Sequence, residues 1–361
     1  MKVLFISRAS LYKVPGGDTI QMEQTAAHLQ HLGIKVDIRL ADDLHIDYAQ
    51  YDLLHTFNII RPSDILFHMQ KSRLPLVLSP IYLEYGTASN EAYTPMLKWL
   101  MNRLGNHRGE YLKNVGRAVL KNEHIRSWKY YYWGQYKSIA YILDHCAMLL
   151  PNSESEFKRL KRDFTGAGDY SVVPNAVDLD LFHFDEAEQD RNNKKVLCAA
   201  RFEPRKNQLN VIRALNHTDF EVTFVGAPAP HHHPYYQQCK AEAAENIRFI
   251  DFTTQDQLAA LYREHKVHIL ASWFETTGLS SLEAAACGCN IVITDCGDTM
   301  DYFGTEAYYC VPDNPGSIAN AVNAAAAAPY SQALLHRIQQ QYSWLHTAEK
   351  TLLAYKRVLN K

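Results

Sequence analysis

The fold is decided by the stretch Val267-His-Ile-Leu-Ala-Ser-Trp-Phe-Glu275-Thr-Thr-Gly278-Leu-Ser-Ser-Leu-Glu283-Ala-Ala-Ala286. Its first five residues are mostly aliphatic and predict a short buried strand. A loop containing Gly278 follows, and the small residues after Glu283 favour a helix. The unpaired amides at such a helix start, together with the helix dipole, attract phosphate oxygens. The stretch therefore predicts half of a βαβ unit with an anion site at its turn.

The same alternation of short apolar runs and helical patterns extends over the rest of the chain. Strands are expected at 3–7, 34–40, 53–55, 76–79 and 147–150, and again at 196–200, 222–225, 247–250, 267–271, 291–294 and 308–311. The segment 174–195 between the two series is rich in Asp, Asn and Glu and lacks a sustained period, as a linker does. We therefore expect an α/β protein of two facing, Rossmann-like, doubly wound domains with a ligand cleft between them. The expected domains are 1–176 and 177–343.

Composition narrows the class of protein. The chain has 361 residues, of which 47% are apolar, and its 37 basic and 39 acidic residues give a net charge of −2. This balance argues against a general nucleic-acid binder. Seven cysteines at irregular spacing form neither a disulfide framework nor a paired zinc pattern, which fits a reducing compartment. Neither a signal peptide nor a membrane-spanning run is expected, so a cytoplasmic location is predicted.

Two carboxylates flank the expected helix start. Glu275 and Glu283 are eight positions apart, and at the rise of an α-helix this separates them by roughly 10 Å. That is about the span from a hexose through a diphosphate to a ribose. Because a carboxylate accepts hydrogen bonds from hydroxyls, one Glu can hold the sugar and the other the ribose.

A diphosphate between these carboxylates also requires cations. Arg201 and Lys206 follow the strand expected at 196–200 and are suited to this role. In the first domain, Gly16 and Gly17 form a flexible loop after the first strand, and the loop's amides could reach the same phosphates.

These motifs resemble GT-B fold retaining glycosyltransferases of family 4, the glycosyl transferases group 1. The resemblance rests on Glu275 to Glu283 with the small-residue helix and Gly288, on Arg201 to Lys206, and on Val-Pro-Asn-Ala-Val-Asp at 173–178. It is strong from about residue 147 to 315. It implies net retention of anomeric configuration, no essential metal and no cofactor, a nucleotide sugar donor with UDP as the default, and a C-terminal helix (344–361) that packs back on the first domain.

The resemblance also assigns roles to individual residues. The diphosphate is expected to leave while it assists deprotonation of the acceptor, with Glu275, Arg201 and Lys206 as the catalytic set. The predicted donor-binding residues are Gly16, Gly17, Arg201, Lys206, Phe252, Glu275, Thr276, Thr277, Gly278, Leu279, Ser280 and Glu283.

The acceptor side departs from the family. Many members carry a His after the fourth strand of the first domain, where this chain reads Leu78-Ser-Pro-Ile-Tyr82-Leu-Glu84. Tyr82 and Glu84 are therefore the candidate acceptor residues, together with His55 and Asn58 near the end of the third strand. His55 and Asn58 can equally be structural groups with satisfied hydrogen bonds.

The segment 97–137 carries nine Lys or Arg residues against Glu110 and Glu123, interleaved with Trp and Tyr. Such a surface suits an anionic membrane face or a lipid diphosphate acceptor, and an amphipathic helical pair with a solvated face is the alternative. No nucleic-acid recognition motif accompanies the charge.

We therefore expect a transferase that moves a hexose-type sugar to a glycan or lipid-linked acceptor, in the synthesis of cell-surface polysaccharide or glycoconjugates, at the inner face of the membrane or in the cytoplasm. The alternatives are a non-catalytic nucleotide-sugar-binding subunit and a nucleotide-sugar epimerase of the same fold. A dinucleotide-dependent oxidoreductase is disfavoured because Gly-x-Gly-x-x-Gly is missing after the first strand.

Overall fold

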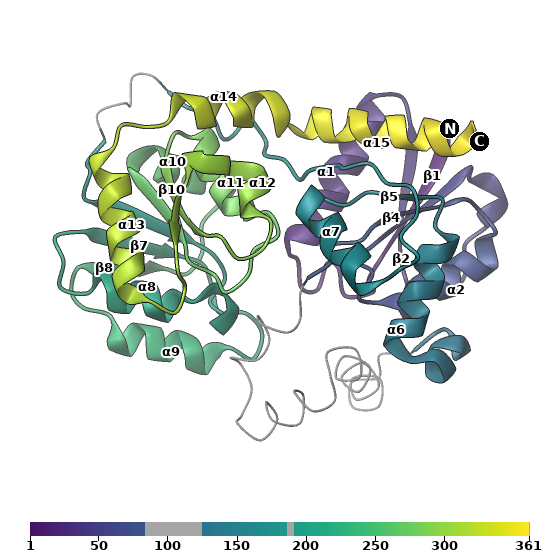
Figure 1. The fold of residues 1–361 in the computed structure, drawn as a ribbon, viewed down its shortest axis with the longest axis horizontal. Helices are drawn as coiled ribbons and strands as arrows, with labels where there is room; N and C mark the ends of the chain where they lie inside the picture. Colours follow the sequence, from purple (N-terminus) through teal and green to yellow (C-terminus); the bar gives the residue numbers. More distant parts are fainter. Residues whose placement is uncertain (84–124, 186–190, 361) are drawn as a thin grey trace. The chain divides into compact units, whose positions relative to one another are not determined.

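The computed structural model describes residues 1–83, 125–185 and 191–360, which divide into two compact units (Figure 1). Within these residues, unit 1 consists of 1–83, 125–175 and 344–360, and unit 2 consists of 176–185 and 191–343. The chain passes from unit 1 to unit 2 between Asn175 and Ala176, and it returns to unit 1 after Ser343. The last helix of the sequence therefore belongs to the same unit as the first strand.

Unit 1 is built on a five-stranded parallel sheet in the order β2-β1-β3-β4-β5. Its strands are β1 (Lys2–Ser7), β2 (Lys35–Leu40), β3 (Leu53–Phe57), β4 (Leu76–Ser79) and β5 (Met148–Leu149). Its helices are α1 (Gly17–His31), α2 (Pro62–Ser72), α6 (Trp128–His145), α7 (Glu154–Asp163) and α15 (Trp344–Leu359). Alternate residues of β1 face opposite sides of the sheet. Val3 and Phe5 share a core with α1 and α15, whereas Leu4 and Ile6 share one with α2, α6 and α7.

Unit 2 has a six-stranded parallel sheet in the order β11-β10-β9-β6-β7-β8. Its strands are β6 (Lys195–Ala199), β7 (Glu221–Val225), β8 (Ile247–Ile250), β9 (Val267–Leu270), β10 (Asn290–Thr294) and β11 (Tyr308–Cys310). Its helices are α8 (Gln208–Leu215), α9 (His233–Glu242), α10 (Gln255–Glu264), α11 (Leu279–Ala286), α12 (Thr299–Phe303), α13 (Pro315–Ala327) and α14 (Gln332–Gln341). Residues of α10, α11 and α14 share one core cluster, and residues of α8, α9 and α13 share another.

The strand order places a topological switch point in each sheet. In unit 1, β2 lies on one side of β1 and β3 on the other, and in unit 2, β7 and β9 flank β6 in the same way. Ligands of such sheets bind beyond the carboxyl ends of the strands at this point. Ligand-binding residues are therefore expected on the loops after β1 and β3 in unit 1 and on the loops after β6 and β9 in unit 2.

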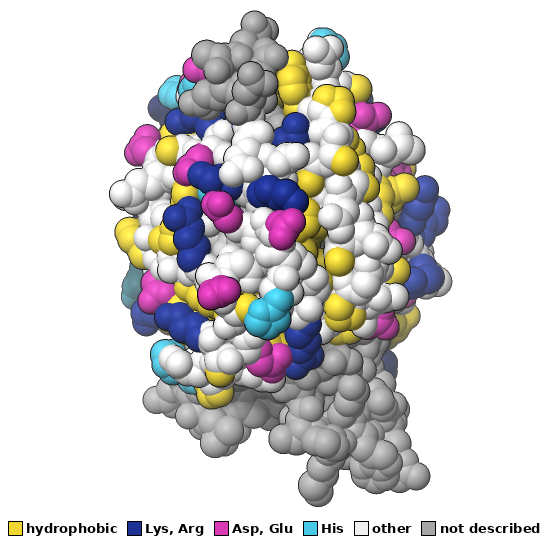
Figure 2. Space-filling view, turned by 90° about the vertical axis from the view of Figure 1, so that its left-hand side faces the viewer, with side chains coloured by type: hydrophobic (Ala, Val, Ile, Leu, Met, Phe, Trp, Pro, Cys, Tyr) yellow, Lys and Arg dark blue, Asp and Glu magenta, His cyan; other side chains and the backbone are white. Residues whose placement is uncertain are grey.

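Helix α15 is anchored firmly to unit 1. Its Ala348 and Tyr355 are completely buried in the core cluster that contains Phe5 and Met22, and the Thr347 hydroxyl donates a hydrogen bond of 2.8 Å to the carbonyl of Pro174. Of the helices formed by the described residues, none has the length and apolar content needed to cross a membrane. On the face shown in Figure 2, basic and acidic side chains lie interspersed rather than gathered by sign.

Candidate functional site

The switch point of unit 2 brings two predicted site residues into direct contact. Lys206 ends a short 3-10 helix, η4 (Pro204–Lys206), after β6, and Glu275 lies in the loop after β9. The Nζ atom of Lys206 is 2.5 Å from Oε1 of Glu275. Both side chains are largely shielded, with 16% and 5% of their surfaces exposed. Residues 69 positions apart in the sequence therefore form one charged pair at the place where the sheet topology predicts a ligand.

The backbone around Glu275 is also fixed. Its amide donates to the carbonyl of Cys296 and its carbonyl accepts from the amide of Asp298, each at 2.9 Å. Between these two partners, Gly297 has φ +120°, and a Cβ there would collide with the carbonyl of Glu275. Only glycine adopts this conformation without strain and allows so close an approach.

Arg205 is a site residue that the sequence motif did not reveal. Its Nη1 atom donates to the carbonyl of Phe274 at 3.2 Å and lies 4.0 Å from Oε1 of Glu275, while Nη2 is 2.9 Å from Glu203 Oε1. Burial by itself raises the pKa of Glu275, but Lys206 and Arg205 lower it, and the resulting pKa is below the usual value of a Glu. Glu275 is therefore ionised at neutral pH. The adjacent Arg205-Lys206 pair in the sequence was the available signal.

The loop after Glu275 leads into α11 through Gly278. This residue has the left-handed conformation (φ 69°), and no side chain caps the helix. The amides of Ser281 and Leu282 donate to the Gly278 carbonyl, whereas those of Leu279 and Ser280 have no acceptor among the described residues. Two backbone donors at the positive end of a helix dipole are thus available to an anion.

The two threonines before Gly278 differ in their exposure to solvent. Thr276 is partly exposed, whereas Thr277 is buried and its hydroxyl donates to the Tyr302 hydroxyl at 3.2 Å. Donor binding by Thr276, Thr277, Leu279 and Ser280 stays a prediction, because the structure shows only their places around the helix start.

Glu283 is the fifth residue of α11 and is partly exposed. Tyr262, on α10, donates a hydrogen bond of 3.2 Å to its Oε2 atom. Burial raises the pKa of Glu283 to about 7, although the Tyr262 hydrogen bond lowers it. The assumption of one helix from Glu275 to Glu283 was wrong, because α11 begins only at Leu279. The separation of roughly 10 Å between the two carboxylates was derived from the rise of a continuous α-helix, so it does not hold for this structure.

The other two predicted donor residues of unit 2 are exposed. The guanidinium of Arg201 makes no ion pair within the described part of the chain, and its carbonyl accepts from Gln208 Nε2 at 2.8 Å. Phe252, just after β8, has 81% of its surface exposed. Both are accessible to a ligand, and their roles stay predictions.

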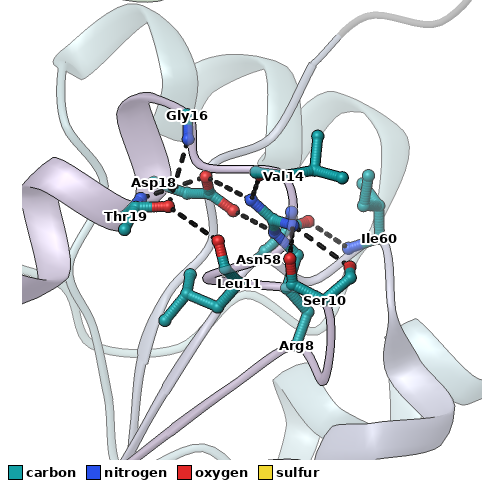
Figure 3. A network of polar contacts seen from close by, with 9 residues as sticks. All are labelled: Arg8, Ser10, Leu11, Val14, Gly16, Asp18, Thr19, Asn58 and Ile60. Carbon is teal, nitrogen blue, oxygen red and sulfur yellow. Dashed lines mark hydrogen bonds and ion pairs between the residues drawn. The ribbon is translucent and has the colours of Figure 1, made fainter. Parts of the chain in front are cut away.

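The switch point of unit 1 contains a network centred on Arg8, which follows β1 (Figure 3). Arg8 Nε and Nη2 bond both carboxylate oxygens of Asp18 at 2.6 and 3.0 Å, and the remaining guanidinium donors bind Ser10 and the Val14 carbonyl. The Asp18 carboxylate also accepts from the amide of Thr19 at the start of α1. Arg8 therefore pins the loop 9–16 to the beginning of α1.

Gly16 and Gly17 lie in this ordered arrangement rather than in a flexible loop. Gly16 has φ −153°, which any residue can adopt, and its amide donates to Thr19 Oγ1 at 3.1 Å. Gly17 is the first residue of α1. Donor contact by the amides of Gly16 and Gly17 stays a prediction.

The structure does not favour two of the predicted acceptor residues. His55 lies inside β3, which extends to Phe57 rather than ending at His55. Its ring is buried, with Nδ1 2.6 Å from the Tyr355 hydroxyl and Nε2 3.0 Å from Ser79 Oγ. Burial lowers the pKa of His55 to about 3. The neutral ring is thus a structural group with both nitrogens occupied.

Tyr82 is also buried, and its hydroxyl donates to Asp163 Oδ2 at 2.7 Å. Its amide donates to Glu156 Oε1 at 2.7 Å. Asn58 is partly exposed at the end of β3 with φ 70° and remains accessible to a ligand. Glu84 lies outside the described residues.

Of the basic aromatic segment 97–137, the structure describes residues 125–137, which lead into α6. Trp128 and Tyr132 are 70% and 88% exposed, Lys137 is exposed on the same helix, and Lys129 is partly exposed. The aromatic and cationic character predicted for this surface is therefore present in the described part. Within residues 1–83, 125–185 and 191–360, no group of three or more His, Cys, Asp or Glu could hold a metal ion.

Comparison with known proteins finds similarity to a known family in the second unit. Residues 181–341 match the family model of glycosyl transferases group 1. Among curated relatives, a probable sucrose-phosphate synthase of Thermosipho melanesiensis is 27% identical over 38% of this chain and 35% of its own length. Alpha-maltose-1-phosphate synthase of Mycobacterium tuberculosis is 27% identical over 52% of this chain and 56% of its own length. The chain thus spans from about a third to just over half of these relatives.

Similarity to solved structures extends over nearly the whole chain. Sucrose-phosphate synthase from Thermosynechococcus elongatus superposes with a TM-score of 0.76 at 16% identity, over 100% of this chain and 99% of the other. Anabaena HepE in complex with UDP and glucose superposes with a TM-score of 0.67 at 16% identity, over 99% and 100%. At this identity the likeness concerns the fold. Residues 181–341 are similar to glycosyl transferases group 1, and the two α/β units have the GT-B fold.

Proposed function

We propose that the protein is a glycosyltransferase that moves a hexose-type sugar from a nucleoside diphosphate to a glycan or lipid-linked acceptor, in the synthesis of cell-surface polysaccharide or glycoconjugates. The observation that carries this proposal is the Lys206–Glu275 pair beside the uncapped start of α11, at the switch point of unit 2. It combines a cation, a carboxylate and free backbone amides in one place, which are the groups that a sugar diphosphate requires.

Each group has a distinct part in the proposal. The Lys206 ammonium, supported by Arg205 and the amides of Leu279 and Ser280, neutralises charge that builds on the departing diphosphate. Glu275, which is ionised and held through its backbone, accepts hydrogen bonds from the sugar hydroxyls. Glu283 does the same for the ribose. The similarity of residues 181–341 to glycosyl transferases group 1 supports retention of configuration, with the diphosphate assisting deprotonation of the acceptor.

UDP is the proposed nucleotide, because the structurally similar Anabaena HepE was solved with UDP and with UDP-glucose. We also propose that the reaction needs no metal ion or other cofactor. A chelator should then leave the rate of transfer unchanged, and loss of activity that added Mg²⁺ restores would overturn this part of the proposal.

The test of the function is nucleoside diphosphate release from a panel of UDP-, GDP- and ADP-sugars in the presence of glycan and lipid-linked acceptors. Release should depend on acceptor and be abolished by Glu275→Gln. Glu242→Gln is a matched control, because Glu242 is ion-paired with Arg213 at 2.8 Å on the surface of the same unit. Tight donor binding without turnover would indicate a non-catalytic binding subunit, and an epimerised sugar formed without acceptor would indicate an epimerase.

A peripheral contact with an anionic membrane at its cytoplasmic face is the second part of the proposal. It rests on Trp128 and Tyr132, which are exposed on α6 together with Lys137 and the partly exposed Lys129. Aromatic rings and lysines of this kind favour the membrane interface. Co-sedimentation should be stronger with phosphatidylserine vesicles than with phosphatidylcholine vesicles and should weaken in a Trp128→Ala/Tyr132→Ala variant. Equal binding to both vesicles would contradict it.

A further inference from the structure

A buried polar cluster lies under α11 and reaches the carboxylate of Glu283. It consists of Tyr262 on α10, His268 on β9 and Ser281 on α11. All three side chains are completely buried. The His268 ring lies 3.3 Å from Ser281 Oγ through Nδ1 and makes an edge contact with the Tyr262 ring, with centroids 5.7 Å apart. Tyr262 in turn donates to Glu283.

The position of Tyr262 is set from several sides. Phe182 contacts its ring edge-on with a centroid distance of 5.9 Å. Its carbonyl accepts hydrogen bonds from Arg191 Nη1 at 3.2 Å and from Cys289 Sγ at 3.0 Å. A tyrosine held at the ring and the backbone has little freedom, so its hydroxyl offers a hydrogen bond in a fixed direction.

Glu283 has no other hydrogen-bond donor to its carboxylate among the residues the structure describes. Tyr262 occupies Oε2 at 3.2 Å, which leaves Oε1 to accept from a ligand at the partly exposed side of α11. A bound carboxylate oxygen also restricts the rotation of the side chain. The arrangement therefore orients the free oxygen before any ligand arrives.

We propose that Tyr262 is a positioning residue that orients Glu283 to accept hydrogen bonds from the ribose hydroxyls of the nucleotide sugar. This inference rests on the proposed function. It adds a residue on α10 to a site that the sequence placed on the loops after β6 and β9 and at the start of α11. Tyr262 acts only through Glu283 and touches neither the sugar nor the diphosphate.

The charge state of Glu283 provides a readout for this role. Burial raises the pKa of Glu283 to about 7, and the hydrogen bond from Tyr262 lowers it. Other titratable groups near the cluster are His268 from β9 and the thiols of Cys287 and Cys289 after α11, and Lys206, His265 and Glu275 act electrostatically on His268. Burial lowers the pKa of His268 to about 3, raises the pKa of the Cys289 thiol to about 11 and raises that of the Cys287 thiol well above its usual value, so His268 and both thiols stay neutral near pH 7. Glu283 is thus the group in the cluster that titrates there.

The experiment measures the dissociation constant for UDP-glucose by calorimetry between about pH 5.5 and 8.5, a range in which this diphosphate diester does not titrate. If the ionised carboxylate binds the ribose, affinity falls by up to about tenfold per pH unit below the midpoint. Tyr262→Phe removes the hydrogen bond that stabilises the ionised form. We expect its midpoint to move to higher pH, so the variant binds more weakly at pH 7 and recovers toward wild-type affinity at high pH.

The matched control is Tyr309→Phe, which deletes a tyrosine hydroxyl that donates to the Gly304 carbonyl at 2.8 Å in the same unit. Its midpoint should equal that of the wild type. Thermal denaturation of each variant separates loss of fold from loss of binding.

The proposal is overturned if Tyr262→Phe superposes on the wild-type curve, or if it weakens binding by the same factor at every pH, as a merely structural residue would. Wild-type binding that is independent of pH would also overturn it while leaving the proposed function intact. If no member of a panel of UDP-, GDP- and ADP-sugars binds the wild type at any pH, the proposed function fails together with it.

Discussion

Replacing Lys206 by Met separates the charge of this residue from its packing. Methionine keeps much of the aliphatic stem and removes the ammonium that lies 2.5 Å from Glu275 Oε1. The carboxylate, of which 5% is exposed, then keeps Arg205 as its nearest cation at 4.0 Å. The substitution therefore leaves a shielded negative charge with weaker compensation.

The size of the effect follows from these distances. Removing one partner of a buried ion pair costs about 3–5 kcal/mol. Opposite charges 4.0 Å apart attract by about 4 kcal/mol at an effective dielectric constant of about 20. Arg205 thus retains much of the compensation. We expect a loss near the lower limit, about 3 kcal/mol of unfolding free energy at pH 7.5.

The loss should depend on pH in a defined direction. The pKa of Glu275 in the folded protein is below its usual value, so its ionisation stabilises the fold above the unfolded pKa, and this stabilisation disappears as the pH falls through the folded pKa. Without Lys206 the folded pKa of Glu275 rises. The difference between wild type and Lys206→Met should therefore be largest at neutral pH and shrink as the pH approaches about 4.5.

Urea denaturation at pH 7.5 and at pH 5 measures both quantities. Lys195→Met is the control, because the Lys195–Glu264 pair is a surface ion pair with 24% and 49% of the side chains exposed and should contribute no more than about 1 kcal/mol. A loss for Lys206→Met equal to that of the control, or a loss that does not change with pH, would refute the electrostatic reasoning.

Three further predictions follow from buried polar groups. Glu283→Gln should stabilise the fold by roughly 1–3 kcal/mol at pH 8 and little at pH 5. The reason is that the pKa of Glu283 is raised in the folded protein, so its ionisation opposes folding as the pH rises. Thermal denaturation at the two pH values checks this. Tyr355→Phe leaves His55 Nδ1 without its buried partner and should cost about 1–3 kcal/mol in urea denaturation. Asn207→Ala removes hydrogen bonds to two buried carbonyls and strains a residue with φ 59°. It should therefore lower the unfolding free energy by about 2–4 kcal/mol. Asn207→Gly should lower the unfolding free energy less, because glycine tolerates that conformation.

Much of the fold could be predicted because the strands are short apolar runs. The strand expected at 76–79 matches β4, and those at 222–225 and 247–250 match β7 and β8 to within one residue. The end of β3 was missed because Thr56 is polar by type but lies buried in the sheet, where Phe57 still pairs with Ser79. Residue type does not reveal whether a polar side chain forms hydrogen bonds with buried groups.

One local motif shows the same limit. Ser153 caps α7 and accepts a hydrogen bond of 2.9 Å from the amide of Glu156. A Glu three residues after a capping Ser is typical of a capping box, but the Glu156 carboxylate instead accepts from the amides of Tyr82 and Asn152 at 2.7 and 2.6 Å. A tertiary contact 74 residues away replaced the local one, because Glu156 is completely buried.

The sequence predicted which residues form the candidate site, but not which of their side chains contact one another. Motif spacing indicated Lys206, Glu275 and Gly278, and the order of the strands brings the loops of Lys206 and Glu275 together at β6 and β9. Spacing carries no information on strand order, so the direct ion pair and the contribution of Arg205 could not be foreseen. The role of Tyr262 depends equally on a contact between α10 and α11 that no linear motif encodes.

The central claim is that the loops after β6 and β9 bind a nucleotide sugar through Lys206 and Glu275. Calorimetric titration of the wild type, Lys206→Met and Glu275→Ala with UDP-glucose and a panel of other nucleotide sugars tests it most directly. We expect at least one donor to bind the wild type, and each variant to lose roughly tenfold to hundredfold in affinity, as removal of a charged hydrogen bond does. Binding of that donor with undiminished affinity by both variants, or no binding of any donor by the wild type, would contradict the claim.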